Sequence, residues 1–157
     1  MRAVSILLAV VIVMLVMGPG RAEQPGSLPG TVVLPTKLSF DALLERTQKA
    51  IEASGMLLVC KASASQGAAA RGIKIPGNAV LMVFRNDYAV RMLEASVAAG
   101  FEAPIRLYVT ENGDGSATLT YRKPSAVFAP YGSVALDKIA LELDAVFDKI
   151  ASDALHG

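Results

Sequence analysis

Two runs of alternating side chains around a glycine-rich turn, residues 105–122, constrain the fold more than any other feature of this chain. The runs read IRLYVTE and SATLTYR, and NGDG lies between them. Apolar residues fall at every second position, namely Ile105, Leu107, Val109, Ala117, Leu119 and Tyr121. A period of two is typical of strands that have one buried face. We therefore predict an antiparallel hairpin with one face on the core.

The register of this hairpin follows from the same alternation. A two-residue turn would oppose Val109 to Thr118 and mix the two faces. A three-residue loop, residues 113–115, instead opposes Val109 to Leu119 and keeps the apolar face continuous. Because a slip of one residue turns every side chain over, the buried face selects the three-residue loop.

The polar face of the hairpin then has Arg106 opposite Arg122 and Tyr108 opposite Thr120. Like charges that are directly opposed disfavour a sheet, so something should offset the two arginines. Either solvent, strand twist or an acidic side chain screens them, or this face meets a second subunit or a small anionic ligand. Forked guanidinium donors suit carboxylate or sulfate. These four residues form the candidate ligand or dimer face.

Residues 1–22 have the layout of a secretory signal peptide. One basic residue, Arg2, precedes an apolar run from Val4 to Met17, and Ala22 follows a Gly-Pro-Gly break. The run of 14 residues is shorter than the ~20 that a spanning helix needs. We predict cleavage after Ala22, a periplasmic or secreted location, and no stable membrane insertion afterwards. An uncleaved membrane anchor is the alternative.

The remaining chain has the size of one domain and a balanced charge. Its 135 residues carry 13 Lys and Arg against 14 Asp and Glu, a formal charge of −1. This balance offers no electrostatic case for binding nucleic acid. Residues 23–30, EQPGSLPG, are predicted to be a flexible leader, and residues 31–157 a single domain. The one cysteine cannot form an intramolecular disulfide.

Strands are also expected at residues 31–39, 56–62 and 79–84. Pro35 suits the first of these to a sheet edge, because proline cannot donate to a ladder. The second run, MLLVCKA, is mostly apolar and too short for a typical helix, so it is predicted to be an interior strand.

Three helices are expected, and the pattern of apolar positions places them at residues 40–54, at residues 87–100, and from Val134 onward. Ser39, Asn86 and Ser133 are their expected N-caps. The second helix has Ala89, Leu93 and Val97 on one face. The order β-α-β-β-α-β-β-α fits an α+β two-layer sandwich, in which three helices cover one face of a mixed sheet of about five strands.

Cys60 falls in the predicted interior strand. We expect it to be a small core residue, because free cysteine is among the most buried residue types. A reactive thiol or a metal ligand is the alternative. In that case Cys60 would act with Met82, or with Met56 or Met92, as soft ligands for copper(I) or haem iron.

The usual catalytic sets are missing from the sequence. His156 is the only histidine and the penultimate residue, and chain ends fray. No Ser-His or Cys-His pair can therefore be built. The chain also lacks the CxxCH that attaches c-type haem. We predict no enzymatic activity and no bound cofactor.

Three segments resemble a known family. GMLLVCKASAS, AVLMVFRND and PIRLYVTENGDGSATLTYRKPSAVFAPYG, followed by a long closing helix, are similar to domain-of-unknown-function family 302 over about residues 38–155. The most specific residues are Pro104, Arg106, Val109, Glu111, Gly115, Tyr121 and Pro124. The resemblance implies a compact α+β fold, usually a homodimer, and no established activity. Some similar proteins are predicted to be exported in sulfur-oxidising settings, which is an analogy only.

Two functions from different classes remain. The first is an exported non-catalytic module, dimeric through an open sheet face, that binds a small ligand or a partner protein with Arg106, Tyr108, Thr120 and Arg122. The second is a redox, haem, soft-metal or sulfur-species binding protein that uses Cys60 and a methionine such as Met82. A structural partner of an envelope complex cannot be separated from the first by sequence.

Overall fold

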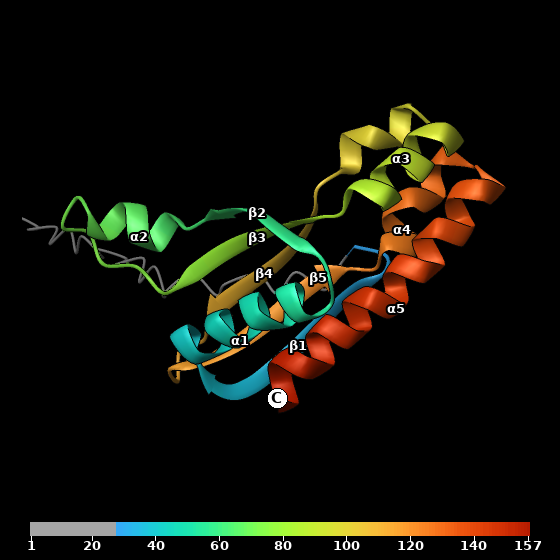
Figure 1. The fold of residues 1–157 in the computed structure, drawn as a ribbon. Helices are drawn as coiled ribbons and strands as arrows, with labels where there is room; N and C mark the ends of the chain where they lie inside the picture. Colours follow the sequence, from blue (N-terminus) through green and yellow to red (C-terminus); the bar gives the residue numbers. More distant parts are fainter. Residues whose placement is uncertain (1–27) are drawn as a thin grey trace, which may run out of the picture.

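A computed structural model describes residues 28–157. Five strands form one sheet in the order β1-β5-β4-β3-β2, and every neighbouring pair is antiparallel (Figure 1). The strands are β1 (Thr31–Ser39), β2 (Leu57–Ala62), β3 (Asn78–Phe84), β4 (Ile105–Glu111) and β5 (Ser116–Arg122). The helices are α1 (Phe40–Ala53), α2 (Ala64–Ala69), α3 (Asn86–Ala95), α4 (Pro124–Phe128) and α5 (Val134–His156), with short 3-10 turns η1 (Ala98–Glu102) and η2 (Ala129–Tyr131).

The helices leave one face of the sheet open. Figure 1 shows α1 and α5 on one side of the strands, with α3 and α4 beside the upper part of α5. The core lies between α1, α5 and the sheet, and its largest fully buried side chains include Phe147, Leu43, Ile51, Leu107 and Leu119. No helix among residues 28–157 lies against the other face. α2 extends past the end of the sheet on the arm that joins β2 to β3 (Figure 1).

Serine side chains cap the N-termini of the two long helices, α1 and α5. Ser39 Oγ accepts a hydrogen bond from the Ala42 backbone N–H at 3.4 Å, and Ser133 Oγ accepts one from the Leu136 N–H at 3.3 Å. Each serine therefore satisfies an amide that the first helical turn leaves without a partner. The predicted caps of α1 and α5 are confirmed, whereas α3 begins one residue earlier, at Asn86.

The predicted hairpin register is confirmed. Val109 pairs with Leu119 and Tyr108 with Thr120 across β4 and β5. Gly115 has a φ of +81°, a left-handed conformation that glycine adopts without the usual steric cost. On the face toward the helices, Val109 and Leu119 are fully buried, so the alternation reports the core side correctly.

Two details of the predicted architecture are wrong. The sheet is antiparallel throughout rather than mixed, because α1 links two parallel strands, β1 and β2, that lie at opposite edges and never pair. Five α-helices stand in residues 28–157 rather than three. The additional ones, α2 and α4, have 6 and 5 residues, which is too short to show helical periodicity.

The prediction of an interior strand at residues 56–62 is also wrong. β2 is an edge strand, and Leu57 and Val59 are largely exposed. Cys60 is exposed and is not a core residue. A run of apolar residues is compatible with burial, but it does not specify the neighbours that would cover it, and here nothing pairs with the outer edge of β2 within the described chain.

β1 lies at the opposite edge, as Pro35 predicts, and its pairing with β5 shifts register after Pro35. The predicted signal peptide and most of the predicted leader lie outside the described residues. Between residues 28 and 157, no helix combines the length and the apolar character that crossing a bilayer requires.

Candidate functional site on the open face

The open face of the sheet consists of the side chains that alternate with the core residues. β4 alternates regularly, with Leu107 and Val109 buried and Arg106 and Tyr108 exposed. Because neighbouring antiparallel residues share a face, the open face also carries Val80, which pairs with Tyr108. Two of the candidate residues from the sequence, Tyr108 and Thr120, lie directly opposite each other on this face.

A polar groove of about 840 Å³ runs across this face. It lies near the β4–β5 turn and reaches from β1 to the residues that precede and begin β3. We define the polar groove by the residues that line it: Val33, Pro35, Thr36, residues 75–78, Tyr108, residues 110–114, Ser116, Thr118 and Thr120. It includes Tyr108 and Thr120 but neither Arg106 nor Arg122.

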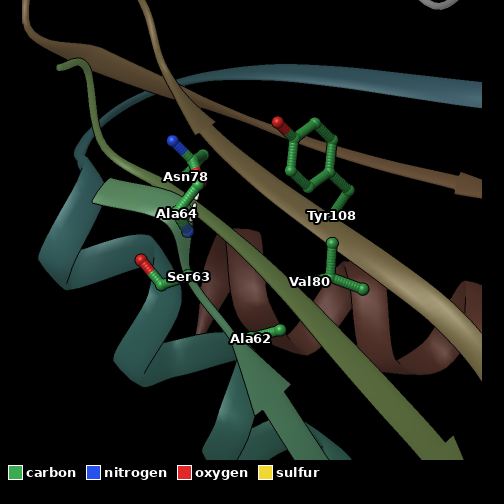
Figure 2. Close-up of a pocket in the computed structure, with 6 residues that line it drawn as sticks. All are labelled: Ala62, Ser63, Ala64, Asn78, Val80 and Tyr108. Atoms are coloured by element: carbon green, nitrogen blue, oxygen red, sulfur yellow. Dashed lines mark hydrogen bonds between the residues drawn. The ribbon is translucent and has the colours of Figure 1, made fainter. Parts of the chain in front are cut away.

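A second hollow of about 550 Å³ adjoins the polar groove. It is lined by Ala62, Ser63, Ala64, Asn78, Val80 and Tyr108. Asn78 and Tyr108 therefore belong to both hollows. Figure 2 shows the Tyr108 ring standing up from β4, with Val80 and Asn78 on the neighbouring strand β3. Tyr108 forms a ridge between two depressions.

The floor and the turn end of the groove are held by side-chain hydrogen bonds. Asn112 Nδ2 donates to Ser116 Oγ at 2.9 Å, and Thr118 Oγ1 donates to Asn112 Oδ1 at 3.0 Å. Asp114 Oδ1 accepts from the Ser116 backbone N–H at 3.0 Å and from its hydroxyl at 2.6 Å. These donations lower the pKa of Asp114 below its usual value, so its carboxylate stays ionised.

The opposite wall of the groove is tied to the sheet in the same way. Glu111 Oε2 accepts from the Gly77 backbone N–H at 2.6 Å. Asn78 Oδ1 accepts from the Ala64 N–H at 3.0 Å, and Asn78 Nδ2 donates to the Pro76 carbonyl at 3.0 Å. The Glu111 bond fixes the segment before β3 against β4, and the Asn78 bonds tie that residue to the start of α2 and to Pro76, which gives the groove a defined wall.

Three hydroxyls in the groove make no such hydrogen bonds. Tyr108 and Thr110 project from β4 and Thr120 from β5, and none makes a side-chain hydrogen bond to another residue of the described chain. Thr120 is only 7% exposed, so Tyr108 and Thr110 are the more accessible of the three. A hydroxyl offers one donor and two acceptor sites. The groove therefore presents unused polar groups on a framework whose other polar groups are already engaged.

The two arginines lie at the other end of the same strands. Arg106 is opposite Met82 of β3, and Arg122 is opposite Thr31 of β1. Arg122 donates to the Ala126 carbonyl at 3.2 Å, and neither arginine has a salt bridge within residues 28–157. Arg122 Nε and Thr31 Oγ1 are buried without a hydrogen-bond partner there.

Cys60 and Met82 are brought together. They are direct cross-strand partners on β2 and β3, after a register shift between Leu58 and Cys60. The other two methionines, Met56 and Met92, line a separate cavity of about 30 Å³ next to α3. No group of three or more His, Cys, Asp or Glu side chains is placed to hold a metal ion in the part of the chain that the structure describes.

Two acidic residues of α5 have structural partners. Asp148 Oδ1 accepts from the Tyr121 hydroxyl at 2.6 Å, and Asp144 accepts from Ser125, at 2.9 Å from its backbone N–H and 2.6 Å from its hydroxyl. Burial and the Asp148 carboxylate both raise the pKa of Tyr121. These bonds hold α5 to β5 and α4, so they belong to the fold rather than to the open face.

Sequence reasoning missed most of the groove. Asn78 and the segment before β3 reach Glu111 and Asp114 of the hairpin only in the folded sheet. The alternation of the hairpin was the available signal, since it places Thr110 on the same face as Tyr108.

Comparison with known proteins identifies the family. The model of the family described as "Domain of unknown function DUF302" matches residues 32–154. The chain belongs to the DUF302 family. Its fold resembles the crystal structure of an uncharacterised conserved DUF302 protein from Bacillus stearothermophilus, with a TM-score of 0.68 and 18% sequence identity over 81% of this chain and 96% of that one. No curated protein matches the chain.

Proposed function

We propose that this DUF302 protein is an exported, non-catalytic module that binds a small polar ligand in the polar groove. The observation that carries the proposal is the groove itself, where the hydroxyls of Tyr108, Thr110 and the mostly buried Thr120 make no hydrogen bond to another described residue. Ligand sites commonly combine a concave surface with a few well-placed polar groups. The surrounding hydrogen bonds hold the site in shape before a ligand arrives, which lowers the entropic cost of binding.

The groove lining supports binding rather than chemistry. It contains hydroxyls, amides and two carboxylates, Glu111 and Asp114, but no histidine, cysteine or lysine. Both carboxylates already accept hydrogen bonds from the protein. A general base with a nucleophile in reach is the minimum for most hydrolytic or transfer reactions. The carboxylate–hydroxyl contact in the lining, Asp114 with Ser116, lies at the β4–β5 turn, where both side chains are already engaged in hydrogen bonds that hold the turn.

The proposal includes a homodimer, as the family resemblance implies. The half of the open face beyond the polar groove is available to a second copy. It carries Met82, Phe84 and the exposed Leu57 around Arg106. Exposed apolar side chains that gather on one surface are typical of interaction sites.

Native mass spectrometry of the protein purified from its own compartment tests both parts. We expect a dimer mass with an additional small molecule, and we expect Tyr108→Ala and Thr120→Val to lose the small molecule while the dimer remains. Phe101→Ala is the matched control, because Phe101 is an exposed aromatic residue, 89% exposed, that lies in η1 and does not line the groove. Retention of the molecule by both groove variants would reject the proposed site.

A soft-metal function is a second candidate, favoured by the pairing of the exposed Cys60 with Met82. Thiolate and thioether ligands select copper(I). Titration of the reduced protein with copper(I) against a competing chelator measures this affinity. A Met82→Leu variant with the same affinity as the unaltered protein would remove Met82 from the site and leave an ordinary surface thiol.

A further inference from the structure

We infer that the polar groove takes a neutral, hydroxyl-rich ligand of the oligosaccharide class rather than an anion. This inference rests on the proposed function, since it assigns the chemistry of the same groove. Its starting point is the contrast between what lines the groove and what stands outside it.

The charges of the lining argue against an anionic ligand. No lysine or arginine lines the polar groove or the adjoining hollow, whereas Glu111 and Asp114 do. The nearest candidates for anion recognition, Arg106 and Arg122, lie at the opposite end of the strands. A carboxylate or sulfate group in the groove would therefore meet like charge without a compensating cation.

The uncharged polar groups fit a polyhydroxylated ligand. The hydroxyls of Tyr108 and Thr110 can each donate and accept, as each sugar hydroxyl also can, and the less accessible Thr120 lies opposite Tyr108. Glu111 and Asp114 each use one oxygen in the protein's own hydrogen bonds, and the described residues give the other oxygen no donor. A carboxylate oxygen of this kind accepts from a sugar hydroxyl without requiring a charge on the ligand.

Tyr108 supplies the apolar part of the same recognition. Its side chain is 37% exposed, although it sits in the middle of the sheet on β4. A tyrosine ring offers a flat apolar surface together with a polar tip, and the C–H faces of a pyranose ring are apolar. Figure 2 shows the ring raised above the strand, where a sugar can pack against it.

The shape of the two hollows indicates a ligand longer than one ring. The polar groove crosses from β1 to the start of β3, and the adjoining hollow continues to Ala62 of β2. Strands are about 4.8 Å apart, so the first part alone extends over about 14 Å. Tyr108 and Asn78 stand between the hollows, so sugar units on both sides would contact the same two residues.

Three trisaccharides, one neutral, one cationic and one anionic, test the inference. The full-length ¹⁵N-labelled protein is titrated with the trimers of N-acetylglucosamine, glucosamine and galacturonate, which are neutral, cationic and anionic. We expect the neutral trimer to shift the amide resonances of Tyr108, Thr110 and Thr120 and to bind at least tenfold more tightly than the anionic one. Tyr108→Ala should weaken that binding about tenfold, a typical loss for one aromatic contact, whereas Phe101→Ala should not.

The outcomes separate this inference from the proposed function. Tightest binding of the anionic or the cationic trimer at those amides would overturn the neutral class and leave the groove as a ligand site. No shift with any trimer, while a different small molecule is found bound by mass spectrometry and is lost in Tyr108→Ala, would overturn only the saccharide class. No shift and no groove-dependent bound molecule would overturn both.

Discussion

Neighbouring residues of β4 serve opposite sides of the molecule. Leu107 has no solvent exposure and packs under the helices, whereas Tyr108, the next residue, is 37% exposed on the open face. The backbone hydrogen bonds of the two residues belong to the same ladders. One strand can therefore stabilise the fold with the side chains on one face while the side chains on its other face stay free for binding. The predictions that follow test how far these two roles are separate.

The largest expected effect is on the covered side. Leu107→Ala should lower the free energy of unfolding by about 3 kcal/mol, within the range of buried leucine truncations. Tyr108→Ala should change it by less than about 1 kcal/mol, since exposed substitutions away from special features have small effects. Urea denaturation measures both. Comparable losses in the two variants would mean that the open face is part of the core in solution, for example because a partner or another segment covers it.

Thiol reactivity compares the open face of the sheet, at Cys60 of β2, with the helix-covered face, at position 79 of β3. Cys60 is exposed in the single chain, so at concentrations below the dimer dissociation constant the native protein should react with a thiol reagent within about tenfold of the rate in urea. The matched variant, Ala79→Cys on a Cys60→Ser background, puts the thiol at a fully buried position of β3. It should react at least about a hundredfold more slowly, because labelling there requires opening of the structure. Slow labelling of Cys60 would indicate that its face is occupied.

The pH dependence of stability probes the covered side through Tyr121. Its pKa is raised by burial and by the Asp148 carboxylate, so the folded state keeps a proton that the unfolded state releases above about pH 10. The unfolded state then binds fewer protons, and this contribution to stability falls as pH rises from about 10 upward. Tyr121→Phe should reduce that loss and cost about 1 kcal/mol at pH 8, where a hydrogen bond to a charged, half-exposed group is removed.

Urea titrations of both proteins at pH 8 and pH 11 give the required difference, because the two proteins differ only in the hydroxyl of residue 121. An identical loss of stability between these pH values in Tyr121→Phe would contradict the assignment. Asp148→Asn is the companion variant, because it keeps an acceptor for the Tyr121 hydroxyl while removing the negative charge.

How much of this arrangement the sequence predicted depends on the distance over which each contact forms. The hairpin register and the start of α5 follow from neighbours within a few residues, and both are confirmed. The position of β2 depends on strands far along the chain, so its apolar run suggested an interior strand where the structure has an edge. The same limit applies to the groove, whose wall at residues 75–78 reaches β4 only after folding.

The second predicted helix, α3, shows on a smaller scale the same dependence on contacts that are distant in the sequence. Its apolar positions predicted a face with Leu93 and Val97, yet Leu93 is 44% and Val97 78% exposed, and Met92 is buried instead. The helix ends at Ala95 and the chain turns into η1, so the predicted stripe spans two differently oriented segments. Which side of a short helix meets the core was decided by α5, against which α3 packs.

The smallest effect on stability is expected at Arg106, which together with Arg122 tests the open face at its other end. Arg106→Ala should change the free energy of unfolding by less than about 0.5 kcal/mol, because an exposed charge without a salt bridge contributes little. Arg122→Ala removes the donor to the Ala126 carbonyl and should cost about 1 kcal/mol. Lysine variants at both positions preserve charge but not the forked donors.

The assembly state is the informative readout for these variants. If a second copy covers this half of the face, Arg106→Ala should shift the dimer dissociation constant by at least fivefold, measured by sedimentation at several concentrations, while trisaccharide binding in the groove stays the same. A shift in ligand affinity with an unchanged dimer would mean that the arginines belong to the ligand site after all. If neither the dimer dissociation constant nor the ligand affinity changes, the two arginines are solvated side chains, and only the groove end of the open face takes part in binding.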